Sequence, residues 1–504
     1  MALIIVFISL VIILAVLLYI LLKRQKQYWR KLNIVGPKPH LLFGDYKDVI
    51  LRHITHFEFH EEVYKAYPKE KVVGLYRFNT PVLLLRDLDI IQHVFIRGFD
   101  SFINRGIEFG NNNRNANLAV STDDTWRMLR TRFSPIFTSG KLKNMVYLME
   151  RCGDKMLKEL DSQKLSSMDL NVQEIAMRYT SGAISACAFG IDMDKPDEKL
   201  LKLEKMLFKN YLALELFYIC PNLLKKLGFN AAPKFISNYF QDLVKLVNMQ
   251  RNGKPSGRKD LMDLILEMKN FSEKIKGGQK NGNKDDEPKV LQITDELIAA
   301  QAMIFYAAGY DTTANTLSHM LYELAKHQDI QEKLYEEIKK TLEENNGELS
   351  LETLKQMSYM DQVFSETLRM YAIADVQRKV SAKSCRIPGV DINLKRDALM
   401  FVSVRGIHYD EEYYPEPYKF DPTRFSQENV KSRHPCAYLP FGLGPRNCIG
   451  MRFAKIQSKV FLVKFLNNYK VEPAAATKKL KFDPMKITLS VAEGLPLKVI
   501  RRNK

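Results

Sequence analysis

Hydrophobic residues along the chain form one uninterrupted run near the amino terminus. Residues 3–22, LIIVFISLVIILAVLLYILL, contain no charged side chain. As a helix, twenty such residues can cross roughly 30 Å of hydrocarbon. Five basic residues follow at 23–31 and none precedes the run, so the positive-inside rule places the rest of the chain in the cytosol. The pattern predicts an uncleaved membrane anchor over residues 1–31.

Two other interpretations of this run fit less well. A cleavable signal peptide has a shorter apolar core, positive charge before it and a small-residue cleavage site after it, and residues 1–31 show none of these. A buried core helix is rarely so uniformly apolar. The anchor therefore remains the preferred prediction.

The remainder of the chain shows mostly helical periodicity. Residues 36–45, GPKPHLLFGD, are a proline-containing connector, and residues 71–87 alternate as two short strands around a turn at 79–81. From about residue 122 onward, apolar residues recur three and four positions apart, as in amphipathic helices. Residues 276–289, KGGQKNGNKDDEPK, are a polar stretch that we interpret as a surface loop. We expect one mainly α domain with a minor β portion over 32–504.

Charge and cysteine content narrow the function classes. The formal net charge is +18, of which +13 remains after the five basic residues of the anchor are removed. A positive charge of this size on residues 32–504 favours binding to anionic lipid or to acidic proteins. The sequence contains no zinc-finger or RNP-like motif that would indicate binding to nucleic acid. The six cysteines lie far apart without CxxC spacing, which argues against a structural zinc site or a disulfide framework.

One cysteine lies in an unusual loop, FGLGPRNCIG at residues 441–450. Glycine costs backbone entropy unless the chain must turn tightly or approach another group closely, so three glycines around Cys448 indicate a loop shaped around a ligand. A dinucleotide loop would require glycine at position 447, where the chain has asparagine. An axial thiolate ligand to haem iron fits better, because backbone N–H groups can then point at the sulfur.

This loop resembles that of the cytochromes P-450. The family pattern Phe-Gly-x-Gly-x-Arg-x-Cys-x-Gly is met at every fixed position by Phe441, Gly442, Gly444, Arg446, Cys448 and Gly450. The resemblance implies the cytochrome P-450 fold preceded by one transmembrane helix, and haem b with its axial thiolate from Cys448. It also implies that Arg446 neutralises a haem propionate and that Phe441 and Gly442 contact the haem.

A long predicted helix, residues 294 to about 326, carries AGYDTT at 308–313. Thr294 is the expected N-cap. Spacings of three and four place five residues on one face: Phe305, Ala308, Gly309, Thr312 and Thr316. A mid-helix glycine costs roughly 1 kcal/mol, which indicates a purpose such as a ligand lying against it. The family's oxygen-side helix is similar, and the resemblance implies that Ala308 and Gly309 lie at the haem, that Thr312 holds dioxygen and that Asp311 relays protons.

Further motifs extend the resemblance from Gly36 nearly to the carboxyl terminus. ETLR at 366–369 together with PYKFDPTRF at 417–425 resembles the buried network of the family, which here would be Glu366, Arg369 and Arg424. WRMLR at 126–130 resembles its second pair of haem-propionate donors, here Trp126 and Arg130. The stretches FTSGKLKNM, ACAFGID and NCIGMRFA are most similar to the insect microsomal P-450s of family six and their relatives.

The chain departs from the family pattern in one region. Ala372 stands where proline is usual, and Lys379, with Arg378 beside it, stands where the family commonly has a propionate-binding arginine. Within the expected pocket wall at 372–377, Asp375 and Gln377 are unexpectedly polar.

The resemblance implies a haem-thiolate monooxygenase on the endoplasmic reticulum membrane, with its catalytic domain facing the cytosol. The expected partners are NADPH-cytochrome P-450 reductase, cytochrome b5 as a second candidate, membrane lipid and an apolar small-molecule substrate. NADPH would act only through the reductase. Plant toxins or insecticides are the preferred substrates, with endogenous lipids or hormones second. An isomerase or lyase of the same family and a non-catalytic haem sensor or carrier are the alternatives.

Overall fold

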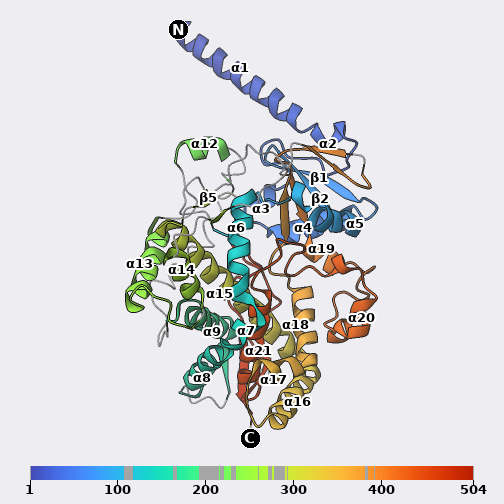
Figure 1. Cartoon of the computed structure of the whole chain (residues 1–504). Coiled ribbons are helices and arrows are strands. Elements are labelled where there is room, and N and C mark those ends of the chain that lie inside the picture. Colours follow the sequence, from blue (N-terminus) through green and yellow to red (C-terminus); the bar gives the residue numbers. More distant parts are fainter. Residues whose placement is uncertain are drawn as a thin grey trace.

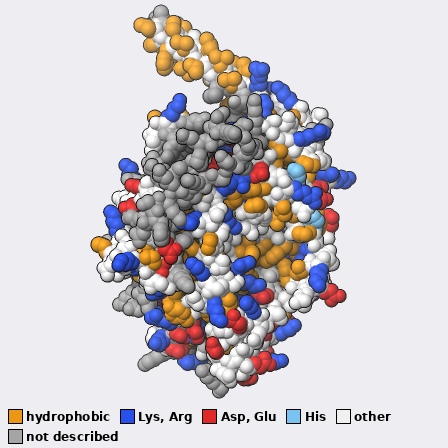
Figure 2. All heavy atoms as spheres, in the orientation of Figure 1, with side chains coloured by type: hydrophobic (Ala, Val, Ile, Leu, Met, Phe, Trp, Pro, Cys, Tyr) orange, Lys and Arg blue, Asp and Glu red, His pale blue; other side chains and the backbone are white. Residues whose placement is uncertain are grey.

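The computed structural model describes residues 2–106, 117–162, 167–191, 215, 221–228, 234–258, 260–270, 275–276, 290–291, 293–380, 384–390 and 392–502. Nearly all of the polar stretch 276–289 lies outside these ranges, as does most of the asparagine-rich stretch 109–120. The amino-terminal helix α1 (Ala2–Gln25) extends away from the body (Figure 1). Figure 2 shows its apolar side chains exposed along its length. Among the described residues it is the one helix long and apolar enough to span a membrane.

A four-stranded sheet forms the lobe nearest α1. Its strand order is β1 (Val72–Arg77), β2 (Thr80–Leu85), β9 (Leu399–Val402) and β6 (Val376–Lys379). β1 and β2 form the predicted hairpin, and β2 pairs in parallel with β9. All six residues of β1 are buried, so the sheet is covered on both faces.

Helix α4 (His56–Ala66) packs beside this sheet. It begins with a capping box, in which the Thr55 side chain accepts a hydrogen bond from the Glu58 backbone N–H and the Glu58 side chain accepts one from Thr55. Its buried face includes Phe57, Phe59 and His60, so α4 presents aromatic and polar rings to the sheet lobe.

Helix α15 (Asp295–Lys326) runs through the centre of the body (Figure 1). Thr294 is its N-cap, as predicted, and accepts a hydrogen bond from the Leu297 backbone N–H. Nearly every side chain of α15 is buried, because other helices surround it. Those in direct contact include α9 (Val172–Ile184), α13 (Lys234–Gln250), α18 (Ser358–Met370) and α21 (Met451–Leu466).

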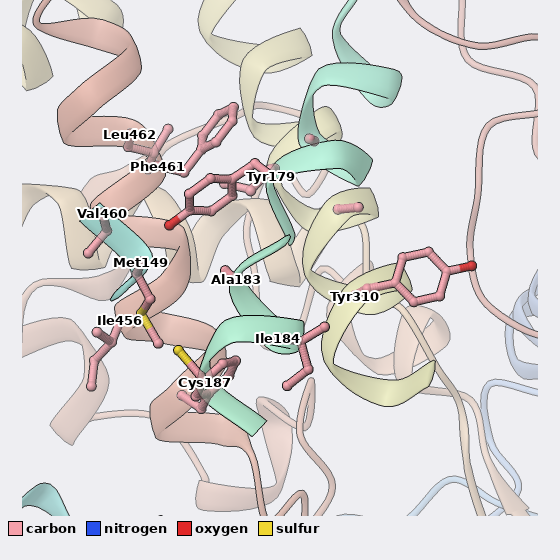
Figure 3. Close-up of a cluster of buried hydrophobic side chains, with 14 of the residues drawn as sticks. Met149, Tyr179, Ala183, Ile184, Cys187, Tyr310, Ile456, Val460, Phe461 and Leu462 are labelled. Atoms are coloured by element: carbon pink, nitrogen blue, oxygen red, sulfur yellow. The ribbon is translucent and has the colours of Figure 1, made fainter. Parts of the chain in front are cut away.

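The contact between α9 and α15 explains one glycine. A Cβ added to Gly309 would lie 2.7 Å from Cδ1 of Ile184, far inside van der Waals contact. Figure 3 shows Ile184 and Ala183 of α9 in the same buried cluster as Tyr310 of α15. Gly309 therefore has a packing role that its helix alone did not reveal, because Ile184 needs the space that a side chain would fill.

The remaining elements complete the fold. The other α-helices are α2 (Tyr28–Lys31), α3 (Lys47–Ile50), α5 (Leu88–Gln92), α6 (Asp123–Phe133), α7 (Ser139–Lys143), α8 (Val146–Ser162), α12 (Pro221–Lys226), α14 (Leu261–Asn270), α16 (Gln328–Glu344), α17 (Leu351–Gln356), α19 (Val404–His408) and α20 (Gln427–Lys431). The other strands are β3 (Ser167–Asn171), β4 (Ile275–Lys276), β5 (Val290–Leu291), β7 (Ser384–Ile387), β8 (Ile392–Lys395), β10 (Tyr469–Pro473) and β11 (Pro496–Arg501). The predicted mainly α fold with a minor β portion is confirmed.

Candidate functional site

The cysteine loop is tightly wound and abuts the sheet lobe. Gly442 and Gly444 have φ angles of 71° and 72°, a region that favours glycine. A Cβ at Gly444 would also lie 1.9 Å from the backbone oxygen of Phe95. The Cys448 backbone N–H donates to the Phe441 oxygen at 2.8 Å, which closes the loop just before α21. The glycines are thus required by conformation and by close approach to the chain.

The sulfur of Cys448 lies deep in the protein and yet remains accessible. Burial raises the pKa of its thiol, and the Gly450 backbone N–H, followed by the positive charges of Arg105 and Arg130, partly opposes that rise. Cys436, in contrast, is fully buried, and burial raises the pKa of its thiol to about 12. Among the described cysteines, Cys448 alone is exposed, which suits a ligand rather than a core residue.

The middle of α15 presents accessible residues within an otherwise buried helix. Ala308 is exposed and Thr312 is half-buried, whereas most of their neighbours are buried. The Thr312 hydroxyl donates to the Ala308 oxygen at 2.6 Å. Phe305 of the same helix stacks on Phe137, whose ring lies 4.0 Å from the position of a Cβ at Gly450. Phe137 therefore connects this part of α15 to the cysteine loop.

Asp311 points away from Thr312, toward the carboxyl-terminal segment. Its Oδ2 accepts a hydrogen bond from the Thr488 hydroxyl at 2.7 Å, and Lys486 Nζ lies 3.9 Å from Oδ1. Burial raises the pKa of Asp311, an effect that Lys486 and Thr488 partly oppose. A buried acid with a raised pKa is suited to proton transfer.

Four arginines gather around the loop and donate to backbone or amide oxygens, and none of them forms an ion pair with a carboxylate of the described residues. Arg446 donates to the backbone oxygens of Ile103, Ala119 and Ser121. Burial and the neighbouring charges of Arg105 and Arg378 lower the pKa of Arg446 to about 8. We call Arg105, Arg130, Arg378 and Arg446 the arginine cluster. Several positive charges close together are costly without counter-ions, so this cluster would be stabilised by bound anions such as the two carboxylates of a haem.

Helix α6 contributes two predicted residues to this cluster. The Trp126 ring lies under the Arg446 guanidinium, 4.9 Å away. Arg130 donates to the backbone and side-chain oxygens of Asn447 at 2.9 and 2.8 Å. The structure thus brings Trp126, Arg130, Arg446 and the cysteine loop together, as the sequence predicted.

The structure distinguishes Arg378 from Lys379. Arg378 is buried over the Phe95 ring, and its Nε and Nη2 atoms have no hydrogen-bond partner. Lys379 instead forms an ion pair with Asp397, 3.1 Å away at the surface. Arg378 therefore has unused donors inside the cluster, and such buried orphan donors fit a bound anion.

Arg105 was missed by sequence reasoning. It donates to the Ala119 and Arg446 backbone oxygens at 2.9 and 3.0 Å, and burial lowers its pKa to about 10. No local motif marks this residue, because the loop Ile103–Gly106 reaches the cluster only through the tertiary fold.

The Glu366 network is present and lies apart from the arginine cluster. Glu366 accepts two hydrogen bonds from Arg369, at 2.7 and 2.8 Å, and Arg424 Nε lies 3.5 Å from its Oε1. The backbone N–H of Asp421 also donates to Glu366. Glu366 and Arg369 are fully buried, so this network joins α18 to the segment before the cysteine loop. Phe441 is nearby, its ring stacked 6.4 Å from that of Phe364.

Comparison with known proteins is consistent with this geometry. Residues 35–499 match the family model described as "Cytochrome P450". The chain is 42% identical over 495 residues to cytochrome P450 6B7 of Helicoverpa armigera, covering 97% of both chains. It is 43% identical over 496 residues to cytochrome P450 6B1 of Papilio polyxenes, covering 98% of this chain and 99% of the relative. It is 33% identical to probable cytochrome P450 6a13 of Drosophila melanogaster, covering 96% of both.

Proposed function

Because the chain belongs to the cytochrome P450 family and resembles its insect family-six members over nearly its whole length, we propose that it inserts one oxygen atom from O2 into apolar small molecules. The family consists of haem-thiolate monooxygenases, so this protein is a P450 monooxygenase that binds haem through a cysteine. In our proposal Cys448 supplies that thiolate. The observation that carries it is the accessible Cys448, which lies in a glycine-containing loop beside an arginine cluster without an ion-pair partner among the described residues.

The residues around the sulfur would hold and tune the cofactor. When bound, haem supplies the activation of dioxygen and the oxidation of substrate. The Gly450 backbone N–H stabilises negative charge on Cys448, and Trp126 with the arginine cluster would bind the propionates. Ala308, Gly309, Phe441 and Gly442 remain proposed haem contacts.

Proton delivery would involve two neighbouring residues of α15. Thr312 carries a hydroxyl at an accessible position, where it can donate a hydrogen bond to a ligand after releasing the Ala308 oxygen. Asp311, whose pKa burial raises, has its carboxyl group facing Thr488. A transfer from Asp311 toward Thr312 therefore requires the carboxyl to leave Thr488, or a bridging water.

Two observations support the substrate class that we propose, one from the relatives and one from the apolar wall. The three relatives named above are insect family-six proteins. Within 372–377, Ala374 is exposed and Val376 half-buried, whereas the Asp375 side chain is buried. Accessible apolar side chains suit apolar ligands. We propose plant toxins or insecticides as substrates, with endogenous lipids or hormones second.

Electrons would come from NADPH through cytochrome P-450 reductase, with cytochrome b5 as a second donor. An acidic reductase could dock on basic side chains that are close in sequence to the cysteine loop or to Trp126, and the candidates are Arg127, Arg132, Arg452, Lys455 and Lys459. Lys459 must be removed from this set, because it is buried and donates to the Leu354 and Met357 backbone oxygens. Lys455 is half-exposed and pairs with Asp361 at 3.1 Å.

The apolar helix α1 would anchor the protein in the endoplasmic reticulum membrane, with the body facing the cytosol. Its exposed apolar surface and the basic residues at its end support this orientation. Lipid contact would then be limited to α1 and the adjoining part of the body.

Reconstitution with the reductase, NADPH and a panel of plant toxins and insecticides tests the proposal. NADPH-dependent and O2-dependent product formation is expected. Product from a peroxide substrate without NADPH would instead indicate an isomerase or lyase. Haem binding without any product across the panel would favour a sensor or carrier.

A further inference from the structure

A chain of hydrogen bonds leads from Asp375 into the sheet lobe. Asp375 Oδ2 lies 2.7 Å from His60 Nδ1 on α4, and His60 Nε2 lies 2.8 Å from the Tyr46 hydroxyl. The other carboxyl oxygen, Oδ1, accepts a hydrogen bond from the Val404 backbone N–H at 2.9 Å. His60 and Tyr46 are fully buried, and the Asp375 side chain is 4% exposed. Asp375 is the polar residue that looked out of place in the pocket wall, and it is turned away from the wall's accessible side.

The direction of these hydrogen bonds follows from their chemistry. An ionised carboxylate can only accept, so His60 carries a proton on Nδ1. With a neutral ring, Nε2 is then an acceptor, and the Tyr46 hydroxyl donates to it. Each group is matched to its neighbour, so moving one of them leaves a buried polar atom unpaired.

Tyr46 and His60, at the far end of these hydrogen bonds, are themselves packed against other side chains. The Arg77 guanidinium lies over the Tyr46 ring, 5.2 Å from its centroid, and donates from Nε to Glu215 Oε2 at 2.9 Å. The His60 ring packs 5.0 Å from the ring of Phe401 in β9. His60 cannot shift without disturbing the central sheet, so the bond to Asp375 constrains the chain at residue 375.

That constraint acts beside the proposed site. Ala374 and Val376, on either side of Asp375, are the accessible residues, and the Asp375 side chain points into the lobe. The two Val376 methyl groups lie 4.0 Å from the position of a Cβ at Gly442, in the cysteine loop. The tether at Asp375 therefore fixes the backbone that carries Ala374 and Val376 at its contact with the cysteine loop.

We propose that Asp375 and His60 are positioning residues that set the width of the substrate pocket through Ala374 and Val376. They touch neither substrate nor haem, and they act by fixing the position of the wall. The inference rests on the proposed function, because it takes the space beside the cysteine loop as the substrate pocket. Releasing the tether lets the wall leave that position, and a displaced wall penalises large ligands more than small ones.

Optical titration of the haem-loaded protein with imidazole and with 4-phenylimidazole tests this. In Asp375→Ala and His60→Ala we expect the dissociation constant for 4-phenylimidazole to rise about tenfold relative to that for imidazole, the order that a misplaced wall contact produces. Asp375→Asn keeps an acceptor for Val404 and can donate to the other tautomer of His60. It should therefore retain a ratio near that of the native protein.

A matched control lies on the same helix. Tyr64 of α4 is buried and donates to Asp410 Oδ2 at 2.8 Å, a bond like that of Tyr46 but away from the wall. Tyr64→Phe should lower thermal stability as Tyr46→Phe does and leave the ligand ratio unchanged. Tyr46→Phe should raise the ratio of the 4-phenylimidazole to the imidazole dissociation constant, as His60→Ala does, but by a smaller factor.

An unchanged ratio in Asp375→Ala and His60→Ala, or equal weakening of both ligands, would overturn the inference. If those variants fail to load haem, Tyr46→Phe decides in their place, and an unchanged ratio there overturns it equally. Failure of the proposed function has a different signature, which is the absence of a thiolate-type spectrum in the native protein itself.

Discussion

Replacing Arg378 by methionine should have opposite effects on the haem-free and haem-loaded protein. In the structure this guanidinium makes one hydrogen bond, from Nη1 to the Gln377 oxygen at 2.9 Å, and leaves Nε and Nη2 unpaired in a buried site. Burial, and then the charge of Arg105, lower the pKa of Arg378 well below its ordinary value, so its charge is costly before an anion arrives. Arg378→Met should raise the free energy of unfolding of the haem-free protein by about 1 kcal/mol or more.

With haem bound, the same substitution would remove the charge-assisted hydrogen bond that we propose between Arg378 and a propionate. Such a bond contributes about 1.5–3 kcal/mol, which corresponds to an increase of about 10- to 150-fold in the haem dissociation constant. Lys379→Met is the matched control, because Lys379 is the next residue of β6 and pairs with Asp397 at the surface. A partly exposed pair of that kind contributes at most about 1 kcal/mol.

Haem transfer to an excess of an apo-globin measures the dissociation constant, and urea unfolding of the haem-free protein measures its stability. Weaker haem binding in Lys379→Met than in Arg378→Met would refute the reasoning. So would a haem-free Arg378→Met protein less stable than the native one, because the charge would then have had a partner.

Three other predictions concern the Thr312 hydroxyl, the Glu366 network and the amino-terminal helix α1. Thr312→Ala should lower the amount of product formed per NADPH consumed more than it weakens substrate binding, and an unchanged ratio would remove Thr312 from the mechanism. Glu366→Ala leaves Arg369 buried without a counter-ion and should lower the free energy of unfolding in urea by about 3–5 kcal/mol. Arg424 Nε lies 3.5 Å from Glu366, at the edge of the network, so Arg424→Ala should lower the free energy of unfolding by less. An equal decrease in the two variants would contradict this. Deleting residues 2–25, which keeps the buried Trp29 and its hydrogen bond to Leu75, should weaken membrane attachment in a flotation assay and leave haem binding intact, and loss of haem binding would show that α1 is needed by the folded body.

Much of the fold and the site could be predicted because their signals are local. The hairpin at 72–85, the N-cap at Thr294 and the cysteine loop are each encoded within a few neighbouring residues. Gly442 and Gly444 of that loop are required by their own φ angles, which a short sequence motif can reveal.

What could not be predicted depends on contacts between distant segments. Gly309 makes room for Ile184 of another helix, and Arg105 joins the cluster from a loop without a motif. Lys459 looked like a surface charge in sequence but is buried against two carbonyl groups. Asp375 looked like a polar residue in an apolar wall until the structure showed its partner, His60. In each case the neighbour that decides the role is far away in the chain.

The ferrous carbon monoxide spectrum of the haem-loaded protein tests the central claim most directly. The native protein should give a thiolate-type band, Cys448→His should lose that band even if haem is retained, and Cys436→Ala, which removes a fully buried thiol, should keep it. A thiolate-type band that persists in Cys448→His would show that another residue binds the iron and would contradict the account of the site.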